Sequence, residues 1–166
     1  MAARASAAAE TAAKPNERTL VLTRVFDSPP ALMFKAWTEP EHLVRWWGPE
    51  GFTMPSCQID LRPGGAYRYQ MRSAEGTDHW LRGVFKEIDP PHRLVLTWAW
   101  ENVEGDMGSV GHETLLTVTF ADYQGKTKLT MHQAEFESVS ARDAHNKGWS
   151  SALERLGAYV ATEASK

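Results

Sequence analysis

The sequence predicts an α+β domain in which a curved antiparallel sheet wraps around one long C-terminal helix. Between residues 53 and 133, short segments of alternating apolar and polar residues follow one another, separated by turn residues, as in consecutive antiparallel strands. From about Ser140 to Ala164 there is no proline, and apolar residues recur every three or four positions, as in an amphipathic helix. An apolar sheet face must be covered, and this helix is the only predicted element long enough to do so.

The N-terminal part of the chain predicts one strand followed by two short helices. Residues 19–26 are rich in β-branched and apolar side chains and are expected to form the first strand. Prolines then stand in the first turn of a segment whose apolar residues, over 32–37, have helical spacing. Pro40 ends that helix and opens a second one, over residues 41–47.

Six further strands are expected, so the sheet should contain six to seven strands. In the second of the six, Tyr67, Tyr69 and Met71 share one face, which the alternation marks as buried. Glu87 and Arg93 flank a Pro-Pro turn and are expected to form a structural ion pair across their hairpin. The six strands are predicted over residues 53–61, 66–73, 79–88, 93–101, 112–120 and 127–133.

Length and composition indicate one domain, over residues 18–166, preceded by an Ala-rich segment. Residues 1–17 contain no large apolar side chain and are expected to be a disordered tail. A formal net charge of −3 offers no broad basic field for nucleic acid. There is no apolar run of about 18 residues, so no membrane span is expected. The single Cys57 excludes an internal disulfide and fits a reducing, cytoplasmic compartment.

Several ordered motifs resemble a known superfamily. They occupy residues 34–41 (FKAWTEPE), 46–49 (WWGP), 60–65 (DLRPGG), 87–95 (EIDPPHRLV) and 145–149 (HNKGW). With them the chain resembles the START-like, helix-grip SRPBCC superfamily. Within that superfamily it looks like the branch named for the C-terminal domain of the activator of the ninety-kilodalton heat-shock protein's ATPase. The resemblance covers about Arg18 to Val160 and implies a helix-grip fold.

One position departs from the pattern of this family. The family's last strand often ends in His, where this chain has Gln133, with His132 one place earlier. A step of one residue moves a side chain to the opposite face of a strand. A role for an inward His at this position is therefore not carried over to this chain.

A sheet that grips a helix leaves a cleft between them, and this cleft is the predicted ligand site. His145 shares a helix face with Trp149 and is expected to line the mouth of the cleft or to be hydrogen-bonded near the helix start. Gly148 lies within the helix, where it costs about 1 kcal/mol relative to Ala; close packing or room for a ligand would explain it. The predicted ligand-binding residues, with the first two at or near the entrance, are Trp46, Trp47, Tyr67, Tyr69, Met71, Trp98, Trp100, Leu116, Met131, Gln133, His145 and Trp149.

The residues favour a protein that binds a small apolar or aromatic molecule, without a cofactor. The six His form no metal-binding motif, so no metal site is expected. The resemblance implies a second hypothesis, a co-chaperone-like activator of a heat-shock ATPase. It is less favoured because the namesake activators carry an additional N-terminal domain that residues 1–17 are too short to form.

A third hypothesis is a cofactor-free cyclase or hydrolase. Such an enzyme needs a positioned acid or base in the cleft. The only candidates for that role are His145, Glu87 and the Tyr hydroxyls. No catalytic residue is assigned on this basis, and a homodimer is left open.

Overall fold

The computed structural model describes residues 14–103 and 105–164 of the chain. The helical elements are η1 (Pro15–Arg18), α2 (Pro30–Thr38), α3 (Pro40–Trp46), η2 (Gly105–Met107) and α4 (Val139–Ala164). The strands are β1 (Leu20–Phe26), β2 (Thr53–Ile59), β3 (Ala66–Arg72), β4 (Asp78–Asp89), β5 (Arg93–Trp100), β6 (Thr114–Tyr123) and β7 (Lys126–Ala134). The predicted order of one strand, two short helices, a run of strands and a long helix is confirmed.

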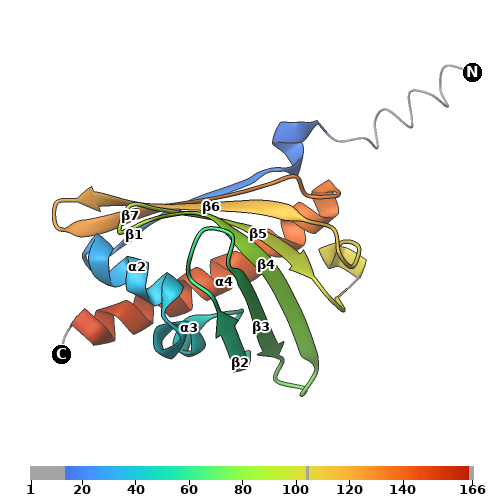
Figure 1. The fold of residues 1–166 in the computed structure, drawn as a ribbon, viewed down its shortest axis with the longest axis horizontal. Coiled ribbons are helices and arrows are strands. Elements are labelled where there is room, and N and C mark those ends of the chain that lie inside the picture. Colours follow the sequence, from blue (N-terminus) through green and yellow to red (C-terminus); the bar gives the residue numbers. More distant parts are fainter. Residues whose placement is uncertain (1–13, 104, 165–166) are drawn as a thin grey trace, which may run out of the picture.

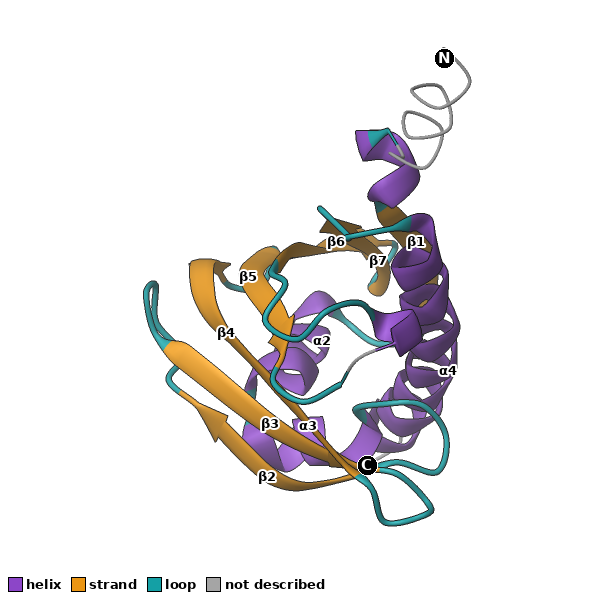
Figure 2. Cartoon of the chain, turned by 90° about the vertical axis from the view of Figure 1, so that its right-hand side faces the viewer, coloured by secondary structure: helices purple, strands orange, loops and turns teal. Residues whose placement is uncertain are grey.

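One seven-stranded sheet forms the body of the domain, with the strand order β1-β7-β6-β5-β4-β3-β2. All neighbouring strands are antiparallel. Figure 2 shows the sheet as an arc that runs from β2 to β1, with α4 closing its open side and α2 and α3 inside the arc. The structure therefore confirms the predicted helix-grip architecture, with α4 as the gripped helix (Figure 1).

The inner face of the sheet is tightly packed around Tyr67. On β4, Gly83 lies opposite Tyr67. A side chain at Gly83 would collide with the carbonyl oxygen of Thr97 and with the Tyr67 ring. The Tyr67 hydroxyl donates to that same carbonyl oxygen. The glycine thus lets the ring lie flat on the backbone, and burial raises the pKa of the Tyr67 hydroxyl well above its usual value.

α4 begins at a side-chain cap and keeps one apolar face against the sheet. The backbone N–H of Ala141 donates to the Ser138 hydroxyl oxygen, at 3.0 Å, which satisfies one of the free donors of the first turn. Farther along, Leu153, Leu156 and Val160 are almost completely buried, as the predicted spacing requires. With 26 residues the helix spans about 39 Å, enough to cross the whole sheet.

The short helices α2 and α3 are joined by a tryptophan cluster. The ring centroids of Trp37 and Trp46 are 4.9 Å apart, and the Trp46 indole N–H donates to the carbonyl oxygen of Ala36 at 2.9 Å. Trp46 is fully buried as a result. The predicted place for it at the cleft entrance is therefore wrong, because its polar end is held by α2 and its ring by Trp37.

The N-terminal boundary also differs from the expectation. Residues 1–13 of the predicted tail lie outside the described residues. Its last part, together with Arg18, forms the short helix η1. The Arg142 guanidinium donates to the carbonyl oxygen of Glu17 at 2.7 Å, so η1 is linked to the start of α4. Across the Pro90-Pro91 turn, the predicted ion pair is present, with 3.2 Å between Arg93 Nε and Glu87 Oε2.

Candidate functional site

A pocket of about 330 Å³ lies between the sheet and the first half of α4. Its walls come from the segment after α3, from β3, β4 and β5, from the region of η2 and from α4. The pocket volume falls at the lower end of the range of small-molecule sites. The lining residues are Trp47, Gly48, Pro49, Phe52, Met71, His79, Trp98, Trp100, Val103, Met107, Ala144, His145, Lys147, Gly148, Trp149 and Ala152.

Aromatic rings make up one wall of the pocket, and Trp98 is at their centre. Its ring centroid lies 5.9 Å from Trp47, 5.6 Å from Trp100 and 5.2 Å from Trp149. Rings at such separations and tilts pack favourably and hold one another in fixed orientations. Four of the seven tryptophans of the chain thus line a single, rigid apolar surface.

The segment of residues 47–49 forms a second wall and is fastened to α4 by Arg155. One guanidinium nitrogen of Arg155, Nη1, donates to the carbonyl oxygens of Trp47, Gly48 and Pro49 at 3.3, 2.9 and 2.8 Å. Gly48 has a φ of +89°, which only glycine adopts without strain. Burial lowers the pKa of Arg155, a cost that these bonds to three carbonyl oxygens offset.

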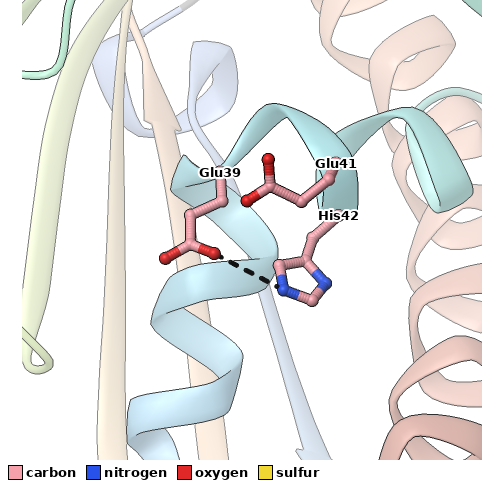
Figure 3. Close-up of side chains that lie close together, drawn as sticks. All are labelled: Glu39, Glu41 and His42. Carbon is pink, nitrogen blue, oxygen red and sulfur yellow. Dashed lines mark ion pairs between the residues drawn. The ribbon is translucent and has the colours of Figure 1, made fainter.

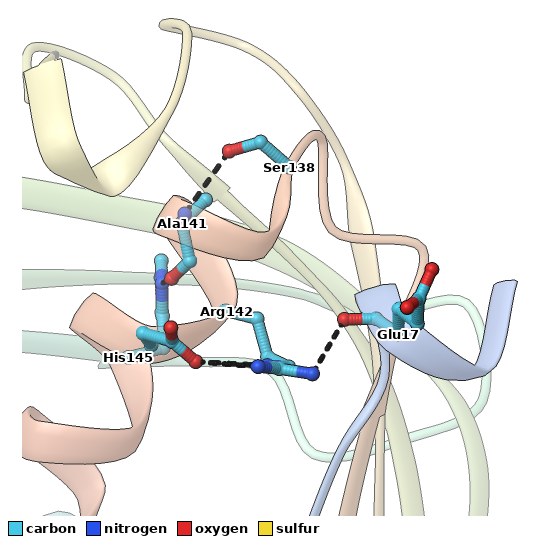
Figure 4. A network of polar contacts seen from close by, with 6 residues as sticks. Glu17, Ser138, Ala141, Arg142 and His145 are labelled. Carbon is cyan, nitrogen blue, oxygen red and sulfur yellow. Dashed lines mark hydrogen bonds and ion pairs between the residues drawn. The ribbon is translucent and has the colours of Figure 1, made fainter. Parts of the chain in front are cut away.

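His145 lies at the end of the pocket nearest the start of α4, with both ring nitrogens engaged. The Trp100 indole N–H donates to Nε2 of His145 at 3.0 Å, so Nε2 must be an acceptor. Nδ1 therefore carries the hydrogen and donates to the carbonyl oxygen of Ala141 at 2.8 Å (Figure 4). The ring is neutral in this arrangement, and burial lowers its pKa below the usual value. His145 lines the pocket and is hydrogen-bonded near the helix start, while its position at the mouth of the cleft stays a prediction.

A buried polar chain behind the pocket fixes Trp149. The Trp149 indole N–H donates to Gln133 Oε1 at 2.9 Å, and Gln133 Nε2 donates to the Thr114 hydroxyl at 2.9 Å. Thr114 in turn donates to the carbonyl oxygen of Trp98. Gln133 is therefore a buried residue whose hydrogen bonds orient Trp149. It occupies the position at which the resembled family often has His.

Six of the twelve predicted ligand-binding residues line the pocket and six do not. Those that line it are Trp47, Met71, Trp98, Trp100, His145 and Trp149. The others are packed into the core, each at most 2 % exposed: Trp46, Tyr67, Tyr69, Leu116, Met131 and Gln133. Alternation placed the five of them that lie on strands on the correct face of the sheet, but they lie farther along it than the pocket, and Trp46 is on α3.

Ten lining residues were not among the predicted ligand-binding residues, and half of them come from loops or from the short helix η2. Phe52, Val103 and Met107 lie outside the regular strands or in the short helix η2. Loops have no hydrophobic period that would mark an inward side chain. An isolated large apolar residue next to a Gly-rich turn was the only signal available, and it is weak.

A second cluster of possible ligand atoms lies where α2 meets α3. Glu39, Glu41 and His42 bring one ligand atom each within 4.8 Å of one another (Figure 3). His42 Nε2 is 3.5 Å from Glu39 Oε1, and His42 Nδ1 is 2.6 Å from the hydroxyl of Tyr159 on α4. Both ring nitrogens thus have protein partners, and these contacts account for the cluster as a link between α3 and α4.

The fold and the pocket together define a helix-grip domain with an apolar cavity beside its long helix. The family model described as "Activator of Hsp90 ATPase homolog 1-like protein" matches residues 27–161, and the chain belongs to this family. The resemblance stated from the motifs is thereby confirmed. No curated protein gives a significant match.

Solved structures agree with this assignment. The AHSA1 protein from Silicibacter pomeroyi is 28% identical, with a TM-score of 0.75, covering 87% of this chain and 99% of that one. A protein from Chromobacterium violaceum is 26% identical, with a TM-score of 0.72 and coverages of 85% and 96%. A protein from Nitrosomonas europaea, 24% identical with a TM-score of 0.75 and coverages of 90% and 98%, shares the fold.

Among the described residues, no helix combines the length and the apolar character needed to cross a membrane. Cys57 lies on β2, partly buried, and burial raises the pKa of its thiol to about 11. The cytoplasmic location expected from this single Cys stays a prediction.

Proposed function

We propose that the protein binds a small apolar or aromatic molecule in the pocket between the sheet and α4. The observation that carries this proposal is a cavity of about 330 Å³ lined by four tryptophans. Burying an apolar molecule there would yield about 25 cal/mol per Å² of apolar surface removed from water. The rings already have fixed orientations, so little ordering would be needed on binding.

The glycine within α4 supports the same proposal. A methyl group added at Gly148 would meet only Pro49 Cγ within 4 Å, at 3.7 Å, which is an ordinary contact. Packing therefore does not require a glycine here, although glycine costs a helix about 1 kcal/mol. Since Gly148 lines the pocket, its missing side chain leaves space for a ligand.

The chemistry around His145 favours binding over catalysis. A general base must accept a proton at a free nitrogen. Nε2 of His145 already accepts the Trp100 N–H, and Nδ1 carries its own hydrogen. Acid–base work at this ring would first have to break the bond to Trp100. Activation of a heat-shock ATPase, the activity named in the family description, stays a separate hypothesis.

The proposal is tested with a neutral fluorescent probe, N-phenylnaphthylamine, and two matched variants. Ala144 lines the pocket, so the larger side chain of Ala144→Leu should occupy part of it. Probe binding should weaken about tenfold or more, because an apolar part of the probe can then no longer be buried in the pocket. Ala158→Leu makes the same change on an exposed part of α4 and should leave affinity unchanged. Probe emission and quenching of tryptophan fluorescence measure the affinity.

Equal affinities in the parent protein and in Ala144→Leu would refute binding in this pocket. Native mass spectrometry of the protein purified from its own host provides an independent readout. The parent protein should carry a small-molecule adduct, and Ala144→Leu should carry less of it.

A further inference from the structure

Although the pocket lining is mainly apolar, its few ionisable side chains are all of one sign. Three of its sixteen lining residues have ionisable side chains, His79, His145 and Lys147, and all three are basic. No Asp or Glu lines it within the described residues. Since His145 is held neutral by Trp100, the positive charge at the pocket comes from the exposed ammonium group of Lys147.

Lys147 is also without an acidic partner. Within residues 14–103 and 105–164, it takes part in no ion pair and its side chain makes no hydrogen bond. Asp143 lies four residues earlier on α4, but its carboxylate pairs with Arg142 at 2.8 Å. Glu154, which lines a shallow hollow together with Lys147, is seven residues farther along α4, or about 10 Å along the helix axis. The charge of Lys147 is therefore free to pair with a group on a bound molecule.

Two further groups at the pocket lack hydrogen-bond partners. The His79 ring packs against Phe52, with centroids 5.4 Å apart, and its nitrogens bond to none of the described residues. The indole N–H of Trp98 also meets no acceptor in this part of the chain, but it is sealed from solvent and therefore lies out of reach of a molecule in the pocket. The His79 ring is only half-buried, so its nitrogens are open to water or to a polar group of a bound molecule.

We propose that the ligand is an anionic amphiphile, with an apolar or aromatic body in the pocket and a carboxylate or sulfonate-like group held at its rim by Lys147. This inference rests on the proposed function of the pocket. The pocket volume of about 330 Å³ lies at the lower end of the range of small-molecule sites, which suits a compact aromatic body rather than a long lipid chain. The acidic group would stay near water, where pairing with Lys147 avoids the cost of burying a charge.

Two probes with the same skeleton test the charge separately from the cavity. N-phenylnaphthylamine is neutral, and anilinonaphthalenesulfonate adds one sulfonate. Lys147→Gln should raise the Kd of the anionic probe about three- to fivefold, the scale of an exposed ion pair. The same variant should leave the Kd of the neutral probe unchanged. Lys147→Arg should restore the affinity for the anionic probe.

Controls separate a local effect from a general one. Lys86→Gln removes an exposed charge on β4 that does not line the pocket, and it should leave both affinities unchanged. Added salt should weaken the binding of the anionic probe to the parent protein and have no such effect on Lys147→Gln.

The outcomes distinguish the two proposals. If the neutral probe binds and Lys147→Gln weakens only the anionic probe, the inference is supported. If the neutral probe binds but Lys147→Gln affects both probes equally or neither, the inference is overturned and the apolar site stands. If neither probe binds the parent protein, both proposals fail.

Discussion

The two halves of α4 meet the rest of the domain in different ways. The first half, over residues 144–152, borders the pocket. The second half packs directly against the core through Leu153, Leu156 and Val160. Each half contains one glycine: a methyl group at Gly148 would enter the pocket lining, 3.7 Å from Pro49 Cγ, whereas one at Gly157 would lie 3.5 Å from the Phe26 ring in the core. One half of the helix therefore secures the fold, so the other can keep an apolar space beside it.

Trp149 stands between the two halves, and its removal should have the largest effect. Its ring stacks on Trp37 at 5.6 Å, and its N–H is bonded to Gln133. Trp149→Ala should lower the free energy of unfolding by about 3–5 kcal/mol, measured by urea denaturation. Trp80→Ala is the control: Trp80 lies outside the core beneath Arg68, and this variant should lose about 1 kcal/mol. A loss below about 1 kcal/mol for Trp149→Ala would mean that α4 is not gripped.

Enlarging a methionine should distinguish packed core from pocket. Met131 is fully buried and does not line the pocket, so Met131→Trp should overpack the core and cost about 1–3 kcal/mol. Met107 lines the pocket, so Met107→Trp should cost less stability and abolish binding of the neutral probe. Urea melts and probe titrations of both variants measure this contrast, and equal stability losses would contradict it.

Lowering the pH should reduce the free energy of unfolding through protonation of His145. Its pKa is lowered in the folded protein from an ordinary value of 6.5, so the unfolded chain binds more protons below that pH. The stabilisation is complete above pH 6.5 and is lost as the pH falls toward the folded-state pKa, with a slope of at most about 1.4 kcal/mol per pH unit. Urea melts between pH 7 and 5 should show this slope in the parent protein.

His145→Gln should flatten that slope, because Gln does not titrate. His92→Gln changes an exposed His and should keep the slope of the parent protein. If His145→Gln and the parent protein lose stability equally over this pH range, His145 is not the group responsible.

The smallest predicted effect is that of replacing each of the two glycines of α4 by alanine, which tests the difference between the two halves directly. Gly148→Ala and Gly157→Ala should each raise the free energy of unfolding by about 0.5–1 kcal/mol, because Ala is the better helix former. Only Gly148→Ala adds a methyl group to the pocket, so only this variant should weaken the neutral probe. Weakening by both substitutions, or by neither, would show that the space at Gly148 does not serve binding.

Most of the fold could be predicted from the sequence, because the residue patterns that mark strands and helices are local. Alternation marked the strands, and the spacing of Trp149, Leu153, Leu156 and Val160 marked α4, whose observed start at Val139 is one residue before the prediction. The pairing of β1 with β7, which completes the arc, is not local. No short-range pattern in the sequence predicts this pairing.

The site was predictable only in part because alternation reports the face of a strand and not the depth along it. Tyr69 and Met71 share an inward face of β3, yet only Met71 reaches the pocket. The difference depends on where α3 and the second half of α4 fill the concave side. Likewise, the neutral state of His145 depends on Trp100, a residue 45 positions away, which no spacing rule connects to it.

The link made by Arg155 does not depend on the side chains of Trp47 and Pro49, although the positive φ of Gly48 between them requires glycine. Every residue type offers the same carbonyl oxygen, and Arg155 bonds to three in succession, at residues 47–49. Substitutions at Trp47 or Pro49 therefore change what the pocket presents to a ligand without removing the groups that attach this wall to α4. In evolutionary terms, the domain separates the anchoring of its binding surface from the chemistry of that surface, so that relatives with the same anchor are free to diverge in what they bind.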